Sequence, residues 1–130
     1  PESAREAAGL LGCTVLLKGA PSLVASGSQP LRVSTVGEAA LAPGGTGDVL
    51  TGLIGAYLAA GLSAPDAATA AMFVSGLAAE VSPEPVGHIA ADLPDRFPNV
   101  RARVRNLGPL TGPVVFASYG PGSAPASGEG

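Results

Sequence analysis

A glycine-rich segment that leads directly into an apolar helix constrains the fold of this chain more than any other feature. Residues 42–48 read Ala-Pro-Gly-Gly-Thr-Gly-Asp, and apolar side chains then recur at helical spacing over an expected helix at 46–60. Glycines let backbone N–H groups converge because no Cβ stands in the way. The first N–H groups of a helix lack partners within it, and the helix dipole is positive there. The segment therefore predicts an anion site suited to phosphate.

The residues expected at this phosphate site are Gly44, Gly45, Thr46 and Gly47, with Asp48 at its mouth. The hydroxyl of Thr46 is expected to add a donor. The helix dipole favours the charged form of Asp48 and so makes it a weak base, but in phosphoryl transfer an aspartate mainly orients the attacking hydroxyl and accepts its proton late. A plainer interpretation is that Asp48 caps its helix and the glycines turn the chain. The length of the glycine-rich run favours the functional interpretation.

Two better-known phosphate loops do not fit this segment. A Walker A motif requires a Gly-Lys-Ser/Thr sequence, and no lysine follows the glycines. A Rossmann fingerprint requires a strand that leads straight into the glycines, and the residues before them read as a loop.

The order of the predicted elements indicates an α/β fold. The expected helices cover 2–11, 46–60, 65–81 and 90–105, with the last split or shortened by Pro94 and Pro98. The apolar run at 14–17 predicts a strand buried on both faces, as in a parallel sheet, and 23–25 with 31–33 predict a small hairpin. These strands are too few for a complete sheet, so we expect the amino-terminal part of the domain to be missing.

The chain is expected to divide into a folded part, residues 1–107, and a flexible tail, residues 108–130. Pro, Gly and Ser recur in the tail, whereas Lys and Arg are absent from it. Residues 114–116 are the one candidate strand in this part.

Composition fits a globular domain and excludes several functions. The hydrophobic fraction is 46% and the charged fraction 13%, which argues against wholesale disorder. The net charge of -3 gives no basic excess for nucleic acid or an anionic membrane, and no apolar stretch is long enough to span a membrane. The first residues do not form a signal peptide, and the single cysteine, Cys13, rules out an internal disulfide. We expect a cytoplasmic protein in which Cys13 is buried.

Several segments together resemble the NAD(P)H-hydrate dehydratase family. They are residues 15–22, 33–37 and 41–52, with further support from 58–62, 76–79 and 90–93. The segments follow in the family's order over residues 4–106. The combination of the Lys-Gly loop with the glycine-rich loop is specific, whereas Gly-Thr-Gly-Asp alone indicates only the wider ribokinase-like superfamily.

The resemblance implies a three-layer α/β/α fold of the ribokinase-like type and a reaction that repairs damaged cofactors. Hydrated NADH or NADPH (NADHX or NADPHX) loses water at the expense of ADP or ATP, because its hydroxyl is phosphorylated and phosphate then leaves. Magnesium is expected to bridge the nucleotide phosphates. The resemblance also implies self-association and a fused or separate NAD(P)H-hydrate epimerase.

The family's functional residues carry over to two segments of this sequence. Lys18, Gly19, Ala20, Pro21 and Ser22 are expected to form a nucleotide-binding segment. The run from Gly44 to Gly47 is expected to hold the nucleotide phosphates, and Asp48 to contact the hydrated substrate and act as its base. Lys18 is the only lysine of the chain, and its plainer interpretation is a surface lysine at the end of a strand.

Some residues depart from the family's usual pattern. Residues 34–36 replace Asn-Pro-Thr, Pro43 replaces a Thr or a similar residue, Ser22 replaces Thr, and Ser75 stands where His is common. We expect these changes to affect affinity more than identity.

The remaining polar residues of interest have plain interpretations. The basic cluster of Arg96, Arg101, Arg103 and Arg105 could contact an anion or RNA. A solvated helix face is the favoured interpretation, because only Phe97 offers an aromatic ring beside it. His88 has no second histidine or cysteine at ligand spacing, so no metal-binding residues are predicted.

Two other functions stay open at this stage. A ribokinase-like kinase acting on a vitamin precursor or a sugar would share the Gly-Thr-Gly-Asp segment. A non-catalytic remnant that binds nucleotide weakly, or that only pairs with a partner, would explain the small number of strands.

Overall fold

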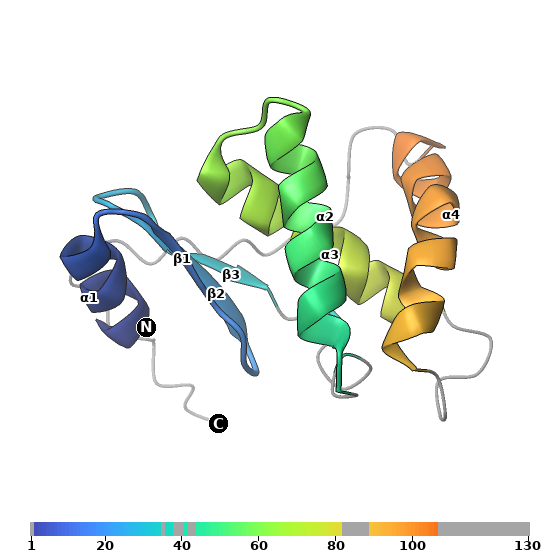
Figure 1. Ribbon diagram of the computed structural model, residues 1–130, viewed down its shortest axis with the longest axis horizontal. Helices are drawn as coiled ribbons and strands as arrows, with labels where there is room; N and C mark the ends of the chain where they lie inside the picture. The colour runs from blue at the N-terminus through green and yellow to red at the C-terminus, as the bar shows by residue number, and fades with distance from the viewer. Residues whose placement is uncertain (1, 35, 38–40, 42–43, 82–88, 107–130) are drawn as a thin grey trace, which may run out of the picture.

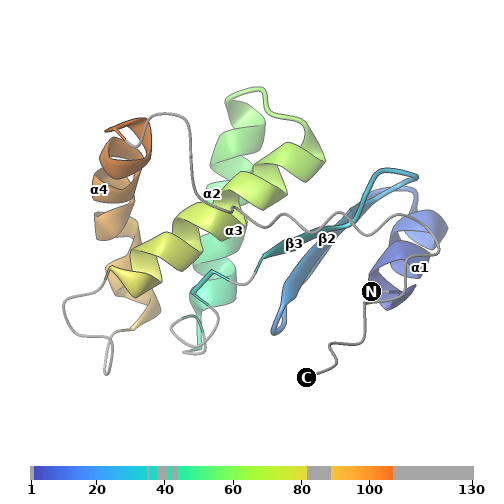
Figure 2. The same cartoon turned by 180° about the vertical axis from the view of Figure 1, so that it is seen from behind.

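The computed structural model describes residues 2–34, 36–37, 41, 44–81 and 89–106. Its elements are α1 (Glu2–Leu11), β1 (Thr14–Leu17), β2 (Ser22–Ser26), β3 (Arg32–Ser34), α2 (Thr46–Ala59), α3 (Ala64–Glu80), the 3-10 turn η1 (Ala90–Asp92) and α4 (Leu93–Asn106). Helix α1 covers one face of the sheet, and α3 covers the other with α2 beside it (Figures 1 and 2). Helix α4 packs on the far side of α3. The described residues therefore form helix, sheet and helix layers.

The three strands form an antiparallel sheet in the order β1-β2-β3. The predicted hairpin is confirmed as β2 and β3. Both faces of β2 are covered, because Leu23 and Ala25 face α1 whereas Val24 faces α2 and α3. The strand predicted at 14–17 is confirmed as β1, but its predicted burial on both faces in a parallel sheet is wrong for the described residues: β1 pairs with β2 in the antiparallel sense, and its Leu17 is 44% exposed. A short apolar run can predict a strand, but it does not show which strand pairs with it or whether the pairing is parallel.

The predicted boundaries of α2 and α3 are confirmed to within one residue at each end. Helix α2 stops where its last carbonyls are satisfied by the following turn: Gly61 N–H donates to Leu58 O, and Leu62 N–H donates to Tyr57 O. Pro65 lies in the first turn of α3, where proline is tolerated because the N–H that it lacks would have no partner within the helix.

Helix α4 is longer than its prolines suggested. It begins at Leu93, just before Pro94, and it continues through Pro98 to Asn106. Proline inside a helix removes one backbone hydrogen bond, but here burial on both sides of Pro98 offsets the loss. Leu93 and Val100 are almost completely buried against α3.

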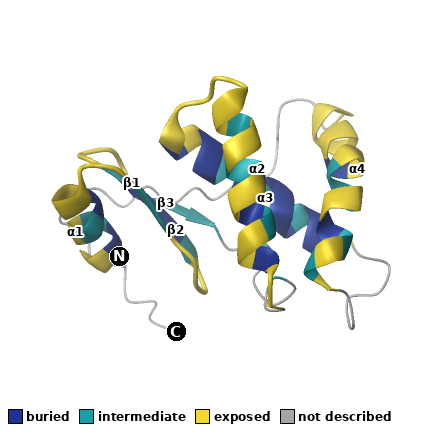
Figure 3. Ribbon diagram, viewed as in Figure 1, coloured by how far each residue is buried: buried dark blue, intermediate teal, exposed yellow. Residues whose placement is uncertain are grey.

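Helix α3 forms the centre of the core (Figure 3). Its buried side chains are mostly alanines, at 67, 68, 71, 78 and 79, each at most 3% exposed. Such small side chains let α3 approach the sheet, α2 and α4 closely at once, in agreement with its contacts on all sides. Met72 is buried, and Phe73 is half-buried and packs against the cluster that contains Leu93 and Val100.

Helix α3 also holds the turn that leads from the sheet toward the glycine-rich segment. A Cβ placed on Gly76 would lie 2.4 Å from the carbonyl oxygen of Val36, so only glycine fits there without a shift. Gly37 makes the reciprocal contact with Gly76, and its N–H donates to Oε1 of Glu80 at 2.7 Å. The backbone of this turn therefore packs directly on the backbone of α3.

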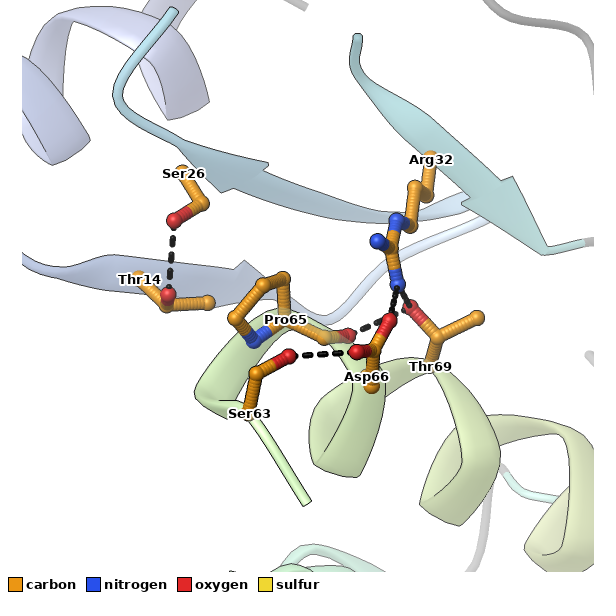
Figure 4. A network of polar contacts seen from close by, with 7 residues as sticks. All are labelled: Thr14, Ser26, Arg32, Ser63, Pro65, Asp66 and Thr69. Carbon is orange, nitrogen blue, oxygen red and sulfur yellow. Dashed lines mark hydrogen bonds and ion pairs between the residues drawn. The ribbon is translucent and has the colours of Figure 1, made fainter. Parts of the chain in front are cut away.

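A second connection joins the sheet to the start of α3 (Figure 4). Arg32 on β3 pairs with Asp66 at 2.7 Å and donates to Thr69 Oγ1 at 3.1 Å. The hydroxyl of Ser63, the N-cap residue of α3, donates to the other carboxylate oxygen of Asp66. The Ser63 side chain makes no capping hydrogen bond to the helix backbone. The hydrogen bonds from Ser63 and from Arg32 hold the pKa of Asp66 below its ordinary value of 3.8. In the same view, Thr14 and Ser26 link β1 to β2 through their hydroxyls.

Three further expectations have different outcomes. Cys13 is exposed and not buried, and it lies in the connection between α1 and β1. The candidate strand at 114–116, the division at 107–108 and His88 lie outside the described residues. No helix among the described residues has the length and hydrophobicity needed to cross a membrane.

Candidate nucleotide-phosphate site

The glycine-rich segment begins α2 in the way that the sequence predicted. Gly45 is the N-cap residue and has a φ of 86°, a left-handed conformation that favours glycine. Its carbonyl oxygen accepts hydrogen bonds from Asp48 N–H and Val49 N–H. The N–H groups of Thr46 and Gly47 find no acceptor within the helix. They are therefore available to an anion at the positive end of the helix dipole.

Lys18 connects the two segments that the sequence assigned to nucleotide binding. Its Nζ donates to Thr46 Oγ1 at 2.5 Å and to the carbonyl oxygen of Leu41 at 3.3 Å. The residue as a whole is exposed, but its ammonium group reaches a side chain that is only 2% exposed. Lys18 is thus more than a surface lysine at the end of β1, because it connects the loop after β1 to the first turn of α2.

Thr46 uses its hydroxyl differently from the expectation. The hydroxyl is buried, donates its one proton to Leu41 O at 2.8 Å and accepts from Lys18. It therefore has no proton to offer a phosphate in this arrangement. Thr46 can contribute through its backbone N–H, while its side chain fixes the position of the helix start.

Asp48 lies in the first turn of α2, three residues after the N-cap, and is exposed. No hydrogen bond or ion pair joins its carboxylate to another described residue. The simpler interpretation, in which Asp48 exists to cap its own helix, therefore has no supporting contact. In phosphoryl transfer a carboxylate commonly orients the attacking hydroxyl, and the carboxylate of Asp48 is not engaged by another described residue.

The loop from Lys18 to Ser22 is closed by its own hydrogen bonds. Ser22 Oγ donates to Gly19 O at 3.0 Å and accepts from Gly19 N–H. The peptide bond between Ala20 and Pro21 is cis. The loop is exposed at Ala20 and Pro21, so this part of the predicted nucleotide segment faces outward beside the helix start.

A small pocket lies between the sheet, α2 and α3. Its described lining is Lys18, Ser22, Ser34, Val36, Leu41, Thr46, Leu50, Met72 and Ser75. The cavity volume is about 20 Å³, enough for one water molecule and far below the roughly 300 Å³ of a small-ligand pocket. A nucleotide could therefore contact the rim formed by Lys18 and the start of α2, but it could not enter the cavity.

Ser34 and Ser75 belong to this pocket, and sequence reasoning noted them only as departures from the family pattern. Ser75 is 1% exposed, and its hydroxyl has no hydrogen-bond partner. A serine inside an alanine-rich helix gives little signal in a sequence. Its place beside Lys18 and Thr46 follows from the packing of α3 against the sheet.

The structure thus brings together most of the predicted site. Lys18 and Ser22 share a pocket with Thr46, and Gly44, Gly45 and Gly47 precede or begin α2. Ala42 and Pro43 lie outside the described residues. The described residues contain no group of three His, Cys, Asp or Glu side chains that could hold a metal ion.

The sequence is similar to known proteins over most of its length. Residues 1–98 match the model of a family described as NAD(P)H-hydrate dehydratase. A bifunctional NAD(P)H-hydrate repair enzyme from Pyrobaculum aerophilum is 44% identical over 101 residues, covering 76% of this chain and 20% of that protein. An ADP-dependent (S)-NAD(P)H-hydrate dehydratase from Neisseria meningitidis serogroup B is 45% identical over 89 residues, covering 68% and 30%. This chain spans less than a third of either relative.

Solved structures are similar as well. One is described as the ADP/ATP-dependent NAD(P)H-hydrate dehydratase from Bacillus subtilis, co-crystallised with ATP and Mg²⁺. It superposes with a TM-score of 0.72 at 32% identity, covering 78% of this chain and 38% of that one. The α/β/α layers expected from the sequence are therefore those of a known fold, of which this chain covers part.

Proposed function

The chain belongs to the NAD(P)H-hydrate dehydratase family, and on that premise we propose that it acts in the nucleotide-dependent dehydration of hydrated NADH or NADPH. The nucleotide is ADP or ATP. Because the chain spans less than a third of the two relatives above, the activity of a whole enzyme is part of this proposal.

One observation carries the proposal further than the similarity does. The hydrogen bond from Lys18 Nζ to Thr46 Oγ1 joins the two predicted nucleotide segments. The two bonded residues lie 28 residues apart in the sequence. Thr46 is also the first residue of α2, which follows the left-handed cap at Gly45 and carries Asp48 in its first turn. A nucleotide phosphate and a hydroxyl-bearing substrate can therefore meet at one place.

The proposed chemistry has two steps. The hydroxyl oxygen of the hydrate attacks the terminal phosphorus of the nucleotide and displaces the shortened nucleotide, AMP from ADP or ADP from ATP. Asp48 orients that hydroxyl and accepts its proton. Phosphate then leaves with the former hydroxyl oxygen, and loss of a proton from the neighbouring carbon restores the double bond of the reduced nicotinamide. The N–H groups of Thr46 and Gly47 stabilise the phosphate charge, and Lys18 keeps the helix start in place.

Magnesium fits this site as an ion held by the nucleotide phosphates and water. Mg²⁺ usually keeps several waters and binds substrate phosphates, which leaves the exposed carboxylate of Asp48 to the substrate hydroxyl. When bound, the ion would neutralise charge on the nucleotide phosphates. We also propose self-association, and an NAD(P)H-hydrate epimerase as a fused or separate partner, since one relative is described as bifunctional.

The test uses the 130-residue chain with hydrated NADH, Mg²⁺ and either ADP or ATP, and follows the return of reduced-nicotinamide absorbance. We expect recovery that needs nucleotide, is lost in Asp48→Asn, and persists in Asp95→Asn. The control makes the same chemical change in the first turn of α4, at another exposed carboxylate.

Other outcomes separate the remaining functions. Conversion of ATP to ADP that depends on a vitamin alcohol or a sugar, without turnover of the hydrate, would establish the ribokinase-like kinase instead. If no turnover occurs, thermal stabilisation by ADP or ATP would identify a retained phosphate site. Absence of both turnover and stabilisation would leave only the non-catalytic remnant.

A further inference from the structure

A second pocket lies between the end of α3 and the inner face of α4, and none of its described residues lines the candidate phosphate site. We name it the α4 pocket, and its described lining is Val81, Arg96, Asn99, Val100 and Arg103. Its volume is about 320 Å³, which lies in the range of small-ligand sites, unlike the water-sized cavity beside Lys18. The α4 residues occur at spacings of three, four and seven, so they share one helix face.

Arg96 provides the first sign that something binds here. Its Nη1 atom is buried and has no hydrogen-bond partner. A buried donor on a charged group is costly when it is left unsatisfied, and folded proteins rarely tolerate one without an ion or a water molecule. Val100, which is only 1% exposed, lines the same pocket as Arg96.

Among the described residues, no acidic side chain lines the pocket beside its two arginines. No ion pair joins Arg96 or Arg103 to an acidic side chain among the described residues. Two acids at the start of this region do not line the pocket: Asp92 in η1 accepts from Ile89 N–H, and Asp95 in α4 is exposed. The C-terminal end of α3 at Val81 carries partial negative charge, which makes guanidinium groups favourable there. Those carbonyls nevertheless give Nη1 of Arg96 no hydrogen bond.

We propose that the α4 pocket binds an oxyanion, with the phosphate group of a small molecule as the best match. A guanidinium presents a planar fork of donors that fits two phosphate oxygens. Arg96 and Arg103 supply two such forks, and the amide of Asn99 adds a neutral donor between them. The expectation of a solvated helix face then holds for Arg101 and Arg105, which are exposed and lie outside the pocket.

The experiment is a nuclear magnetic resonance titration of the isotope-labelled 130-residue chain with inorganic phosphate and then pyrophosphate, at constant ionic strength. We expect saturable shifts of the Asn99 side-chain amide and of the Nε–H signals of Arg96 and Arg103. Shifts at Gly45 and Gly47 would report the candidate nucleotide site separately, so the two sites are distinguished residue by residue.

Charge variants test whether the binding is specific. Arg103→Gln is expected to weaken phosphate binding by about tenfold or more, as loss of a charge-assisted hydrogen bond predicts. Arg101→Gln is the matched control, because it removes the same charge from the same helix outside the pocket, and it should weaken binding less than about twofold. Arg96→Gln should act like Arg103→Gln. If the Arg96→Gln variant fails to fold, the Arg103→Gln variant still tests the proposal, because Arg103 is exposed.

Two results would overturn the proposal. One is the absence of saturable shifts at α4 in millimolar phosphate and pyrophosphate. The other is an equal loss of phosphate affinity in Arg101→Gln and Arg103→Gln, which would indicate nonspecific electrostatic attraction to a basic helix and no specific binding site.

Discussion

Replacing Gly76 by alanine is expected to destabilise the fold even though alanine favours helices. An added Cβ would lie 2.4 Å from Val36 O, 2.9 Å from Val36 C and 3.0 Å from Val36 Cγ1. An ordinary contact between carbon and oxygen is about 1 Å longer than the first of these distances, so the turn or the helix must move. Insertion of a methyl group into tight packing costs about 1–3 kcal/mol.

The helix propensity of alanine acts in the opposite direction. In a helix interior alanine is better than glycine by about 1 kcal/mol. The net change in the free energy of unfolding should therefore be a loss of about 1 kcal/mol, with a fall in Tm of about 4 °C for a domain of this size. The turn at Val36 and Gly37 leads toward Leu41 and Thr46, so affinity for nucleotide should fall as well.

Gly55→Ala on α2 is the matched control for this experiment. A Cβ at Gly55 meets nothing within 4 Å, so the variant receives the propensity gain without the steric cost. Urea unfolding of both variants, followed by circular dichroism, isolates the contact: their free energies of unfolding should differ by about 1–3 kcal/mol. Equal stability of the two variants would refute the direct backbone contact between α3 and the turn.

Three further predictions concern side chains that the structure places. Thr46→Val, which keeps the shape and removes the hydroxyl, should lower the free energy of unfolding by about 1–3 kcal/mol in urea titrations; a smaller loss than in Lys18→Ala would contradict the buried hydrogen bonds assigned to Thr46. Asp66→Asn tests pH dependence: because the folded pKa of Asp66 lies below 3.8, the parent's stability advantage should be complete above that pH and shrink as the pH falls below it. An advantage that does not change in acid unfolding curves would rule out the depressed pKa. Ser75→Ala should leave the free energy of unfolding unchanged or raise it, since an unpartnered buried hydroxyl is lost; a decrease of more than about 1 kcal/mol would show that the hydroxyl has a partner, such as a water molecule.

Local patterns predicted the helices well because those patterns arise within a few residues. The apolar spacing after the glycine-rich segment located α2. The helix predicted at 65–81 agrees with α3 to within one residue at each end. The strand at 14–17 was placed correctly, but its neighbour and its burial were not. Pairing in a sheet depends on residues distant in sequence, and a short apolar run carries no information about them.

The candidate site was predicted as two separate segments, and its internal geometry was not. The sequence indicated that Thr46 would donate to phosphate, whereas the packed structure turns its hydroxyl toward Leu41 and Lys18. Ser75 carried no signal of its own. Both outcomes depend on how closely α3 approaches the sheet, which small side chains permit but do not specify.

The sequence by itself determined the glycine-rich start of α2, the order of helices and strands, and membership of a family, because each depends on residue types at short or ordered spacings. Only the tertiary structure decided which groups meet. It placed Lys18 on Thr46, Gly76 against the turn at Val36, and an unpaired guanidinium nitrogen of Arg96 in a pocket beside α3. The physical reason is that burial and hydrogen bonding between distant segments follow from the packing of the layers, and that packing is a property of the whole fold.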